Sequence, residues 1–182
     1  MKLGDHGETI GIKEAEERHS LGRLERLQLN LAKGKATVGV VGMGYVGQPL
    51  AITAHSKGFR VVGFDIDAAR VAALNGGRST IRTIPDGKIS SMLVDGCFRA
   101  TNEIGDLSEM DVIVICVPTP LNKYREPDLS HVERTAQSVG AVLRRDQLVC
   151  LESTTYPGCT TEIVKPAMEA SGLKMGEDVF LA

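Results

Sequence analysis

From residue 36 onward, short apolar runs alternate with stretches of helical periodicity, and this alternation constrains the fold more than any other feature. We expect a strand in each of the runs "ATVGVVG", "RVVGFD", "FRAT", "MDVIVICVP", "QLVCLEST" and "DVFLA". The fourth run is apolar without alternation, which is typical of a parallel strand buried on both faces. Strands and helices that alternate this regularly indicate parallel strands joined by right-handed crossovers.

The helical stretches have recognisable ends. Gly34 is expected to follow the C-terminus of a first helix, Asp67 to cap another, and Ser130 with Glu133 to form a capping box. We predict helices over 12–33, 45–57, 67–77 and 86–94, a helix that begins at Ser130, and a helix over 160–171. The predicted fold class is therefore α/β, a Rossmann-type doubly wound parallel sheet in the order 3-2-1-4-5-6, with an N-terminal helical extension.

Three glycines follow the first predicted strand at the spacing G-x-G-x-x-G. In "VGMGYVGQPLA", Gly42 permits a tight turn, Gly44 lets a pyrophosphate approach the backbone, and Gly47 lets the next helix pack close to the strand. The N–H groups and the positive end of that helix would face the phosphates. The spacing alone is weak evidence, but a strand before it and a helix after it are the context that a dinucleotide-binding loop requires.

An acidic residue ends the second predicted strand. Asp65 lies 23 positions after Gly42, where a carboxylate can accept hydrogen bonds from the adenosine ribose hydroxyls. A carboxylate there repels a 2′-phosphate, so NAD is favoured over NADP, although Arg70 nearby keeps NADP open. Asp65 could instead be a helix cap, but Asp67 already fills that role.

Composition excludes several other classes of protein. The chain has 182 residues, a formal net charge of -2, 4% aromatic residues and no tryptophan, which argues against nucleic-acid partners. No apolar run reaches the roughly 18 residues of a membrane span, and the N-terminus lacks the apolar core of a secretory signal, so we expect no membrane association and a cytoplasmic location. The four cysteines form no C-x-x-C pair, so we expect no metal site and reduced thiols.

The first 34 residues differ from the remainder. Residues 1–11 carry no pattern, and leucines at 21, 24, 27 and 31 then recur at helical spacing. A helix with this short stripe could bind a partner, but docking on its own domain is favoured. We therefore divide the chain into an N-terminal extension, 1–34, and a dinucleotide-binding domain, 35–182.

Five separated blocks, in the same order, resemble the UDP-glucose/GDP-mannose dehydrogenase family. They are "GMGYVGQPLA", "GFDIDAARVAALNGGRS", "VIVICVPTPL", "EPDLSHVE" and "LVCLESTTYPGCTTEIVKPAMEASGLKMGEDVFLA", and the match is closest to the UDP-N-acetylhexosamine 6-dehydrogenase branch. The resemblance implies an NAD-dependent enzyme that oxidises the C6 alcohol of a UDP-sugar to a carboxylate in two hydride transfers. It also implies a central helical domain and a UDP-binding domain, which this chain is expected to lack.

The resemblance assigns roles to residues in four loops. Tyr45 and Val46 resemble residues that contact NAD in the glycine loop. Asp65 resembles the acidic residue that binds the adenosine ribose, and Arg70 resembles a residue that flanks the adenosine. Val46 could instead belong to the core.

Three threonines receive roles in the same way. Thr119 resembles a contact near the nicotinamide half of NAD, Thr154 a catalytic hydroxyl that helps to hold a water, and Thr160 a further NAD contact. Thr160 could instead be a helix cap, whereas Thr119 lies between two prolines in a loop with no evident packing role.

The family's nucleophilic cysteine, lysine and asparagine belong to the domains that are expected to be absent. None of Cys97, Cys116, Cys150 and Cys159 is expected to replace that nucleophile, so the fragment alone is expected to be inactive. A stand-alone NAD-binding or regulatory module stays an alternative, and an S-adenosylmethionine-dependent methyltransferase is disfavoured because "ESTTYPG" has no role there. The sequence leaves open the hexosamine epimer and the roles of Cys159 and the extension. We expect a UDP-sugar substrate and a homo-oligomer in the full-length protein.

Overall fold

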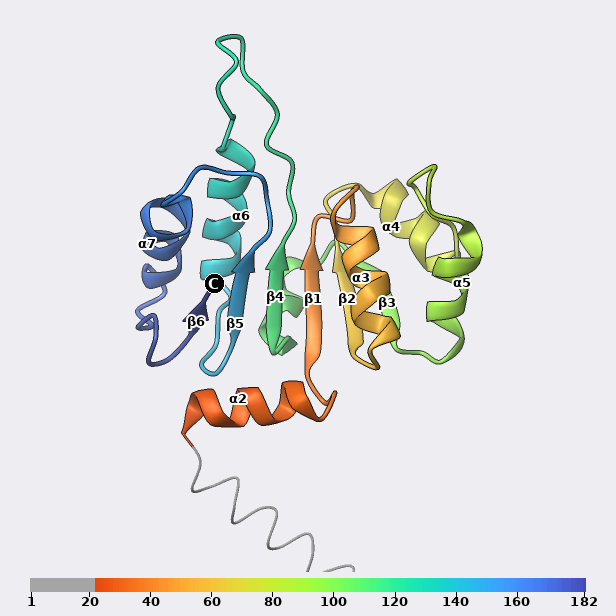
Figure 1. The fold of residues 1–182 in the computed structure, drawn as a ribbon, viewed down its shortest axis with the longest axis horizontal. Coiled ribbons are helices and arrows are strands. Elements are labelled where there is room, and N and C mark those ends of the chain that lie inside the picture. The colour runs from red at the N-terminus through yellow and green to blue at the C-terminus, as the bar shows by residue number, and fades with distance from the viewer. Residues whose placement is uncertain (1–21) are drawn as a thin grey trace, which may run out of the picture.

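The computed structural model describes residues 22–182 and contains one six-stranded sheet flanked by helices. All adjacent strands are parallel, and their order is β3-β2-β1-β4-β5-β6. The strands are β1 (Thr37–Val41), β2 (Arg60–Phe64), β3 (Phe98–Thr101), β4 (Val112–Ile115), β5 (Leu148–Leu151) and β6 (Phe180–Leu181). The predicted strand order is confirmed, and the loops that follow the strands all emerge at one edge of the sheet (Figure 1).

Helical segments fill the connections between the strands. They are α2 (Arg23–Ala32), α3 (Gly47–Ser56), α4 (Ala68–Asn75), α5 (Asp86–Val94), the 3-10 helix η1 (Ile104–Glu109), α6 (Ser130–Gly140), the π-helical segment η2 (Thr160–Val164) and α7 (Lys165–Glu169). The helix predicted over 86–94 has the predicted bounds, and η1 was not predicted. Among the described residues, no helix combines the length and the apolar character needed to span a bilayer.

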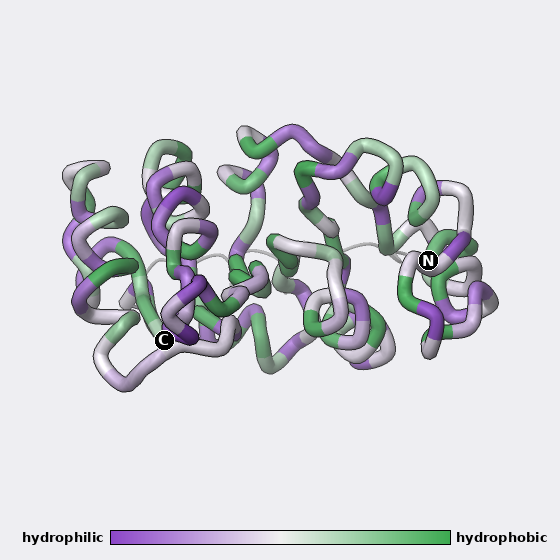
Figure 2. Tube along the Cα trace, turned by 90° about the horizontal axis from the view of Figure 1, so that it is seen from above, coloured by the Kyte–Doolittle hydropathy of each residue, from purple (hydrophilic) through white to green (hydrophobic). Residues whose placement is uncertain are grey.

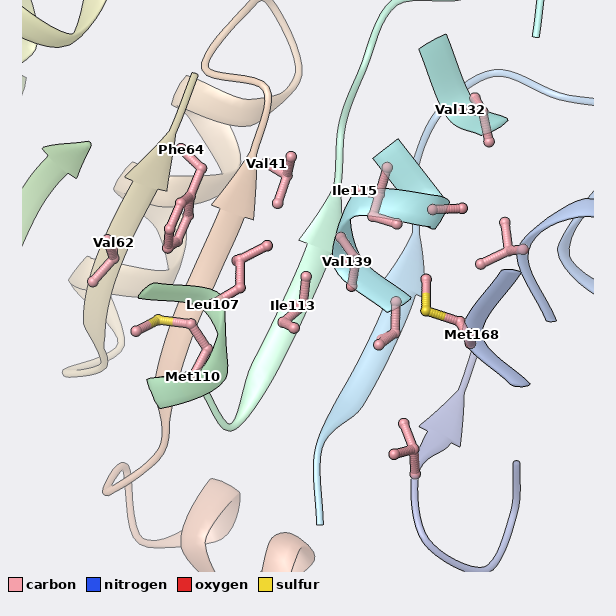
Figure 3. Close-up of a cluster of buried hydrophobic side chains, with 14 of the residues drawn as sticks. Val41, Val62, Phe64, Leu107, Met110, Ile113, Ile115, Val132, Val139 and Met168 are labelled. Atoms are coloured by element: carbon pink, nitrogen blue, oxygen red, sulfur yellow. The ribbon is translucent and has the colours of Figure 1, made fainter. Parts of the chain in front are cut away.

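The core has one layer on each face of the sheet. One layer packs η1, α6 and α7 against the strands and includes Phe64, Ile113, Ile115, Val139 and Met168 (Figure 3). The other layer packs α3, α4 and α5 against the opposite face and is centred on side chains such as Val40, Leu74, Ile89 and Met92. Seen from the carboxyl ends of the strands, the helical tubes carry hydrophobic and hydrophilic residues in turn (Figure 2), as expected of helices that cover a core. Burial on both faces explains the continuous apolar run of β4.

The N-terminal helix lies across the amino ends of the strands (Figure 1). Leu27 of α2 is buried, and the Arg23 guanidinium reaches the Asp146 carboxylate at 3.3 Å, in the turn before β5. The helix therefore docks on its own domain, as favoured from the sequence. Gly34 follows the helix with a φ of 64°, the left-handed conformation of a residue just beyond a helix end. Gly22, which the prediction placed inside the helix, is instead its extended N-cap residue, and the predicted helical residues 12–21, including Leu21, lie outside the described residues.

Two predicted helix ends are wrong in detail. At α6, Ser130 is the first helical residue and makes no capping box; instead the Asp128 carboxylate accepts a hydrogen bond from the Ser130 N–H at 3.0 Å. Asp128 supplies the same kind of acceptor two residues earlier, and this hydrogen bond lowers the pKa of its carboxyl group. The helix predicted over 160–171 starts at Thr160 but opens with a π-helical turn and ends as α-helix at Glu169.

Candidate cofactor-binding site

The turn between β1 and α3 is built from glycines that pack closely and one that does not. Gly42 has a φ of 94°, and a Cβ there would lie 2.6 Å from the carbonyl oxygen of Cys116. A Cβ on Gly47 would collide with the carbonyl oxygen of Gly42, because the start of α3 lies directly over the turn. A Cβ on Gly44 would meet no atom within 4 Å. Gly42 and Gly47 thus shape the turn, and Gly44 faces open space.

This turn presents unpaired hydrogen-bond donors. Within residues 22–182, the backbone N–H groups from Gly44 to Gly47 donate no hydrogen bond, whereas those of Gly42, Met43 and Gln48 are all bonded. The free N–H groups lie at the positive end of the ten-residue helix α3. Tyr45 and Val46 carry two of these N–H groups, and their side chains are exposed. The alternative of Val46 as a core residue is therefore wrong. Backbone donors and a helix dipole at an open surface suit an anionic phosphate group.

Asp65 connects this turn to the next strand. It directly follows β2 and is only 8% exposed. Its Oδ2 accepts a hydrogen bond from the Met43 N–H at 2.9 Å, and its Oδ1 accepts one from the Asp67 N–H at 3.0 Å. Asp67, not Asp65, caps α4, by accepting from Ala69 N–H and Arg70 N–H, as predicted. The carboxylate of Asp65 therefore lies beside the glycine loop, where an adenosine ribose would be held.

Arg70, in the first turn of α4, lies against this carboxylate. Its Nη1 is 3.0 Å from Oδ1 and 2.9 Å from Oδ2 of Asp65, and its Nη2 is 3.9 Å from the Asp67 carboxylate. The Nε of Arg70 is buried and has no partner among the described residues. The structure thus brings Arg70 into direct contact with the predicted ribose acid.

The three predicted threonines lie at the same edge but not together. Thr119 is half-buried in the long loop after β4, which projects above the sheet (Figure 1), and Thr154 is exposed in the loop after β5. Thr160 begins η2 and lines a pocket of about 360 Å³ with Lys165 and Phe180, next to β6. In the described part of the chain no hydrogen bond joins any of the three to the glycine loop. Thr160 is the farthest of the three from the glycine loop in the strand order, because it lies beside the edge strand β6 and the glycine loop follows β1.

The four cysteines are unpaired thiols. Burial raises the pKa of Cys116 to about 12, and the nearby Glu152 carboxylate contributes; burial is also the main cause that raises the pKa values of Cys150 and Cys159. Cys97 lies between α5 and β3, and β3 is the edge strand on the other side of the sheet from β6. A protonated buried thiol is a poor nucleophile, so the structure supports no thiolate chemistry at Cys116, Cys150 or Cys159. Among residues 22–182 no group of three or more His, Cys, Asp or Glu side chains could hold a metal ion.

Sequence reasoning missed Gln48, a buried residue whose side chain holds the backbone of the glycine loop by a hydrogen bond. Gln48 is fully buried in the first turn of α3, and its Nε2 donates to the Met43 carbonyl at 2.8 Å and to the Thr80 hydroxyl at 2.6 Å. Its Oε1 accepts from the Ser79 hydroxyl at 3.0 Å. A polar residue between Gly47 and the apolar remainder of the helix was the available signal. Gln48 therefore fixes the carbonyl of Met43 while Asp65 fixes its N–H.

A second missed residue lies directly after the acid. Ile66 is 96% exposed, although an isoleucine is normally buried. A hollow of about 780 Å³ lies instead between α6 and the segment from η2 to α7, and its lining includes none of the predicted site residues. We place the candidate site at the edge of the sheet where the strands end, not in this hollow, because the free N–H groups of the glycine loop and the buried Asp65 carboxylate lie at that edge.

A parallel sheet in the order 3-2-1-4-5-6, a glycine turn with free N–H groups and an acid after β2 define a dinucleotide-binding domain of the Rossmann class. Residues 36–182 match the description "UDP-glucose/GDP-mannose dehydrogenase family, NAD binding domain", and the chain belongs to this family. NAD is accordingly its cofactor. The structure suits this group, because the Gly44 position is open and the donors around it are unpaired.

Individual relatives agree with this assignment. The chain is 37% identical over 145 residues to protein CapL of Staphylococcus aureus, covering 79% of this chain and 33% of that protein. It is 38% identical over 144 residues to UDP-N-acetyl-D-glucosamine 6-dehydrogenase of Pseudomonas aeruginosa, again 79% and 33%. The crystal structure of NDP-N-acetyl-D-galactosaminuronic acid dehydrogenase from Methanosarcina mazei superimposes with a TM-score of 0.77 at 32% identity, covering 89% of this chain and 36% of that one. The chain thus spans about a third of the length of these relatives.

Proposed function

We propose that this chain is the NAD-binding part of a nucleotide-sugar 6-dehydrogenase that oxidises the C6 alcohol of a UDP-N-acetylhexosamine to a carboxylate in two NAD-dependent steps. The observation that carries the proposal is the bond from the Met43 N–H to Asp65, which sets the ribose acid beside the open glycine loop. The names of the relatives support the substrate class, because one is a UDP-N-acetyl-D-glucosamine 6-dehydrogenase. A cytoplasmic location and a homo-oligomeric whole protein belong to the same proposal.

Each loop has a proposed task. The N–H groups of Gly44, Tyr45 and Val46 hold the pyrophosphate, and the exposed side chains of Tyr45 and Val46 cover it. Bound NAD supplies the acceptor for the hydride that leaves C6. Asp65 accepts hydrogen bonds from the adenosine ribose.

The remaining tasks fall to the loops after β4 and β5. Thr119 contacts the nicotinamide half, and Thr154 orients a water molecule, since both lie in loops on the far side of the switch point between β1 and β4. Thr160 is proposed as a further cofactor contact, and it lies beside β6, where it lines a pocket with Lys165 and Phe180.

Calorimetric titration of the 182-residue chain with NAD and NADP tests the cofactor assignment. We expect NAD to bind more tightly, because the 2′-phosphate of NADP would meet the Asp65 carboxylate. A clear preference for NADP, or no binding of either dinucleotide, would contradict the proposal. For the substrate class, the whole protein encoded by the gene should form NADH with a UDP-N-acetylhexosamine and not with GDP-mannose. A whole protein that binds NAD and oxidises no nucleotide sugar would point to a regulatory module instead.

A further inference from the structure

A second carboxylate lies at the same edge of the sheet as the glycine loop, and no task has been given to it so far. Glu152 directly follows β5, and its N–H donates to the carbonyl of Ile115, the last residue of β4, at 2.9 Å. Glu152 is exposed, and its carboxylate takes part in no hydrogen bond or ion pair within residues 22–182. The described chain therefore leaves this negative charge available to a ligand.

Glu152 lies on the face of the sheet against which α3 packs. Cys116, directly after β4, and Cys150, in β5, both belong to the core layer on that face. Residues two apart in a strand share a face, so Glu152 lies on the same face as Cys150. The thiols agree with this placement: burial is the main cause that raises the pKa of each, and the Glu152 carboxylate is the second cause for both. The carboxylate and the N-terminus of α3 therefore share one face and one edge of the sheet.

The glycine loop and Glu152 are separated by a single strand. The glycine loop follows β1, Glu152 follows β5, and β4 lies between these two strands. Neighbouring strands are about 4.8 Å apart, so the ends of β1 and β5 are about 10 Å apart. Cys116 connects the two, because its carbonyl oxygen lies 2.6 Å from the Cβ position of Gly42. A site for an anion, built from free N–H groups, thus lies about 10 Å from an available negative charge.

The oxidised cofactor carries the complementary pattern of charge. Its pyrophosphate is negative, and its nicotinamide ring, one ribose away, is positive. A dinucleotide lies across the switch point between β1 and β4 in a sheet of this order, so the half beyond the pyrophosphate extends toward β5. The positive ring and the Glu152 carboxylate are therefore expected at the same place.

We propose that Glu152 attracts the positive nicotinamide ring and makes this site bind the oxidised cofactor more tightly than the reduced one. This inference rests on the proposed function, because it requires that the pyrophosphate binds at the glycine loop. The ring of NADH is neutral, so NADH lacks the attraction to the carboxylate. Two successive oxidations use two molecules of NAD. A site that holds NADH less tightly favours its exchange for NAD between the two steps.

The test is the Glu152→Gln variant of the 182-residue chain, titrated with NAD, NADH and ADP-ribose by calorimetry. Glutamine keeps the size of the side chain and removes its charge. We expect NAD affinity to fall by about 5- to 10-fold, the effect of one charge at an exposed site, and NADH affinity to change by less than about 2-fold. ADP-ribose carries the pyrophosphate but no nicotinamide, so its affinity should also stay within about 2-fold.

Glu103→Gln is the matched control for a general change in charge. Glu103 is an exposed glutamate shortly after β3, at the same edge of the sheet, and its carboxylate also has no hydrogen bond or ion pair in the described part of the chain. It lies on the other side of the glycine loop from β5 in the strand order. Glu103→Gln should therefore leave the ratio of the NADH and NAD dissociation constants unchanged.

The possible outcomes separate this inference from the proposed function. If circular dichroism shows that Glu152→Gln is unfolded, Glu152→Ser removes the same charge, and the same loss of NAD affinity is expected. An original chain that binds neither NAD nor ADP-ribose would overturn the proposed function and this inference together. An original chain that binds NAD would leave this inference alone to be overturned, by an unchanged ratio in the Glu152 variant, by the same change in Glu103→Gln, or by an equal loss of affinity for ADP-ribose.

Discussion

At the scale of single residues, the three glycines of one motif have different physical tasks. Gly42 and Gly47 have no room for a side chain, because a Cβ at either position meets a backbone carbonyl oxygen. A side chain at Gly44 would meet no atom of the protein, so the role of this glycine concerns a ligand that occupies that space. A substitution at Gly44 therefore separates ligand binding from folding, which a substitution at Gly42 cannot do.

We expect Gly44→Val to weaken NAD binding by about 100-fold or more while the chain keeps its fold, because the new side chain would take the space of the pyrophosphate. Calorimetry measures the first effect and thermal unfolding the second. Gly105→Val is the matched control, since Gly105 in η1 also has nothing within 4 Å of its Cβ position. Normal NAD binding by Gly44→Val would show that the pyrophosphate does not lie at this loop.

At the scale of elements, one buried amide holds η1 against the start of β5. Gln147 is fully buried, and its Nε2 donates to the carbonyls of Leu107 and Met110 at 2.8 and 2.7 Å. Its Oε1 accepts from the Arg144 N–H at 2.8 Å. The Leu107 carbonyl also accepts from the Met110 N–H at 3.1 Å, and the Met110 carbonyl also accepts from Arg144 Nη2 at 2.9 Å, so Gln147 adds a second hydrogen bond to each carbonyl at the end of η1.

Gln147→Leu should lower the free energy of unfolding by about 1–3 kcal/mol, because it keeps the volume but leaves the Arg144 N–H without its acceptor and removes one hydrogen bond from each of the Leu107 and Met110 carbonyls. Urea denaturation followed by circular dichroism gives this value. Gln137→Leu, on the exposed side of α6, is expected to change stability by less than about 0.5 kcal/mol. Equal midpoints for the two variants would refute the role given to Gln147.

At the scale of the whole molecule, the two edges of the sheet differ. The amino ends of the strands are covered by α2 (Figure 1), whereas the loops after β1, β2, β4 and β5 expose large apolar side chains. These are Tyr45, Val46, Ile66, Leu121, Tyr124 and Tyr156; the other exposed large hydrophobic residues of the described chain, Leu24, Val94 and Ile104, lie on α2, α5 and η1. Six of the exposed apolar residues thus lie in loops at the edge that also carries the glycine loop, as is typical of a surface for binding.

The polypeptide of these 182 residues is expected to bind NAD and yet to form no NADH with UDP-N-acetylglucosamine, its galacto and manno epimers, or UDP-glucose. Hydride transfer needs C6 held about 3–3.5 Å from the nicotinamide, and burial raises the pKa values of Cys116, Cys150 and Cys159, so these thiols are poor nucleophiles. A spectrophotometric assay for NADH, run beside the whole protein, measures this. Sustained turnover by the 182 residues would contradict the prediction and require a nucleophile among them.

The periodicity of the sequence determined the class of fold, the strand order and the position of the glycine loop. These features follow from local patterns, because strands buried on both faces must be apolar and right-handed crossovers leave few topologies. The acid at Asp65 and the cap at Asp67 were predictable for the same reason, since each is fixed by its distance from a strand end.

Only the tertiary structure decided which polar groups form hydrogen bonds and ion pairs with one another. The contact of Arg70 with Asp65, the support of Met43 by Gln48 and the attachment of η1 by Gln147 depend on side chains from separate elements or turns. The capping box at Ser130 failed because Asp128 supplied a competing acceptor two residues earlier. Hydrogen bonds are short-ranged and directional, so a periodic pattern indicates that a polar group is buried but not which partner it finds.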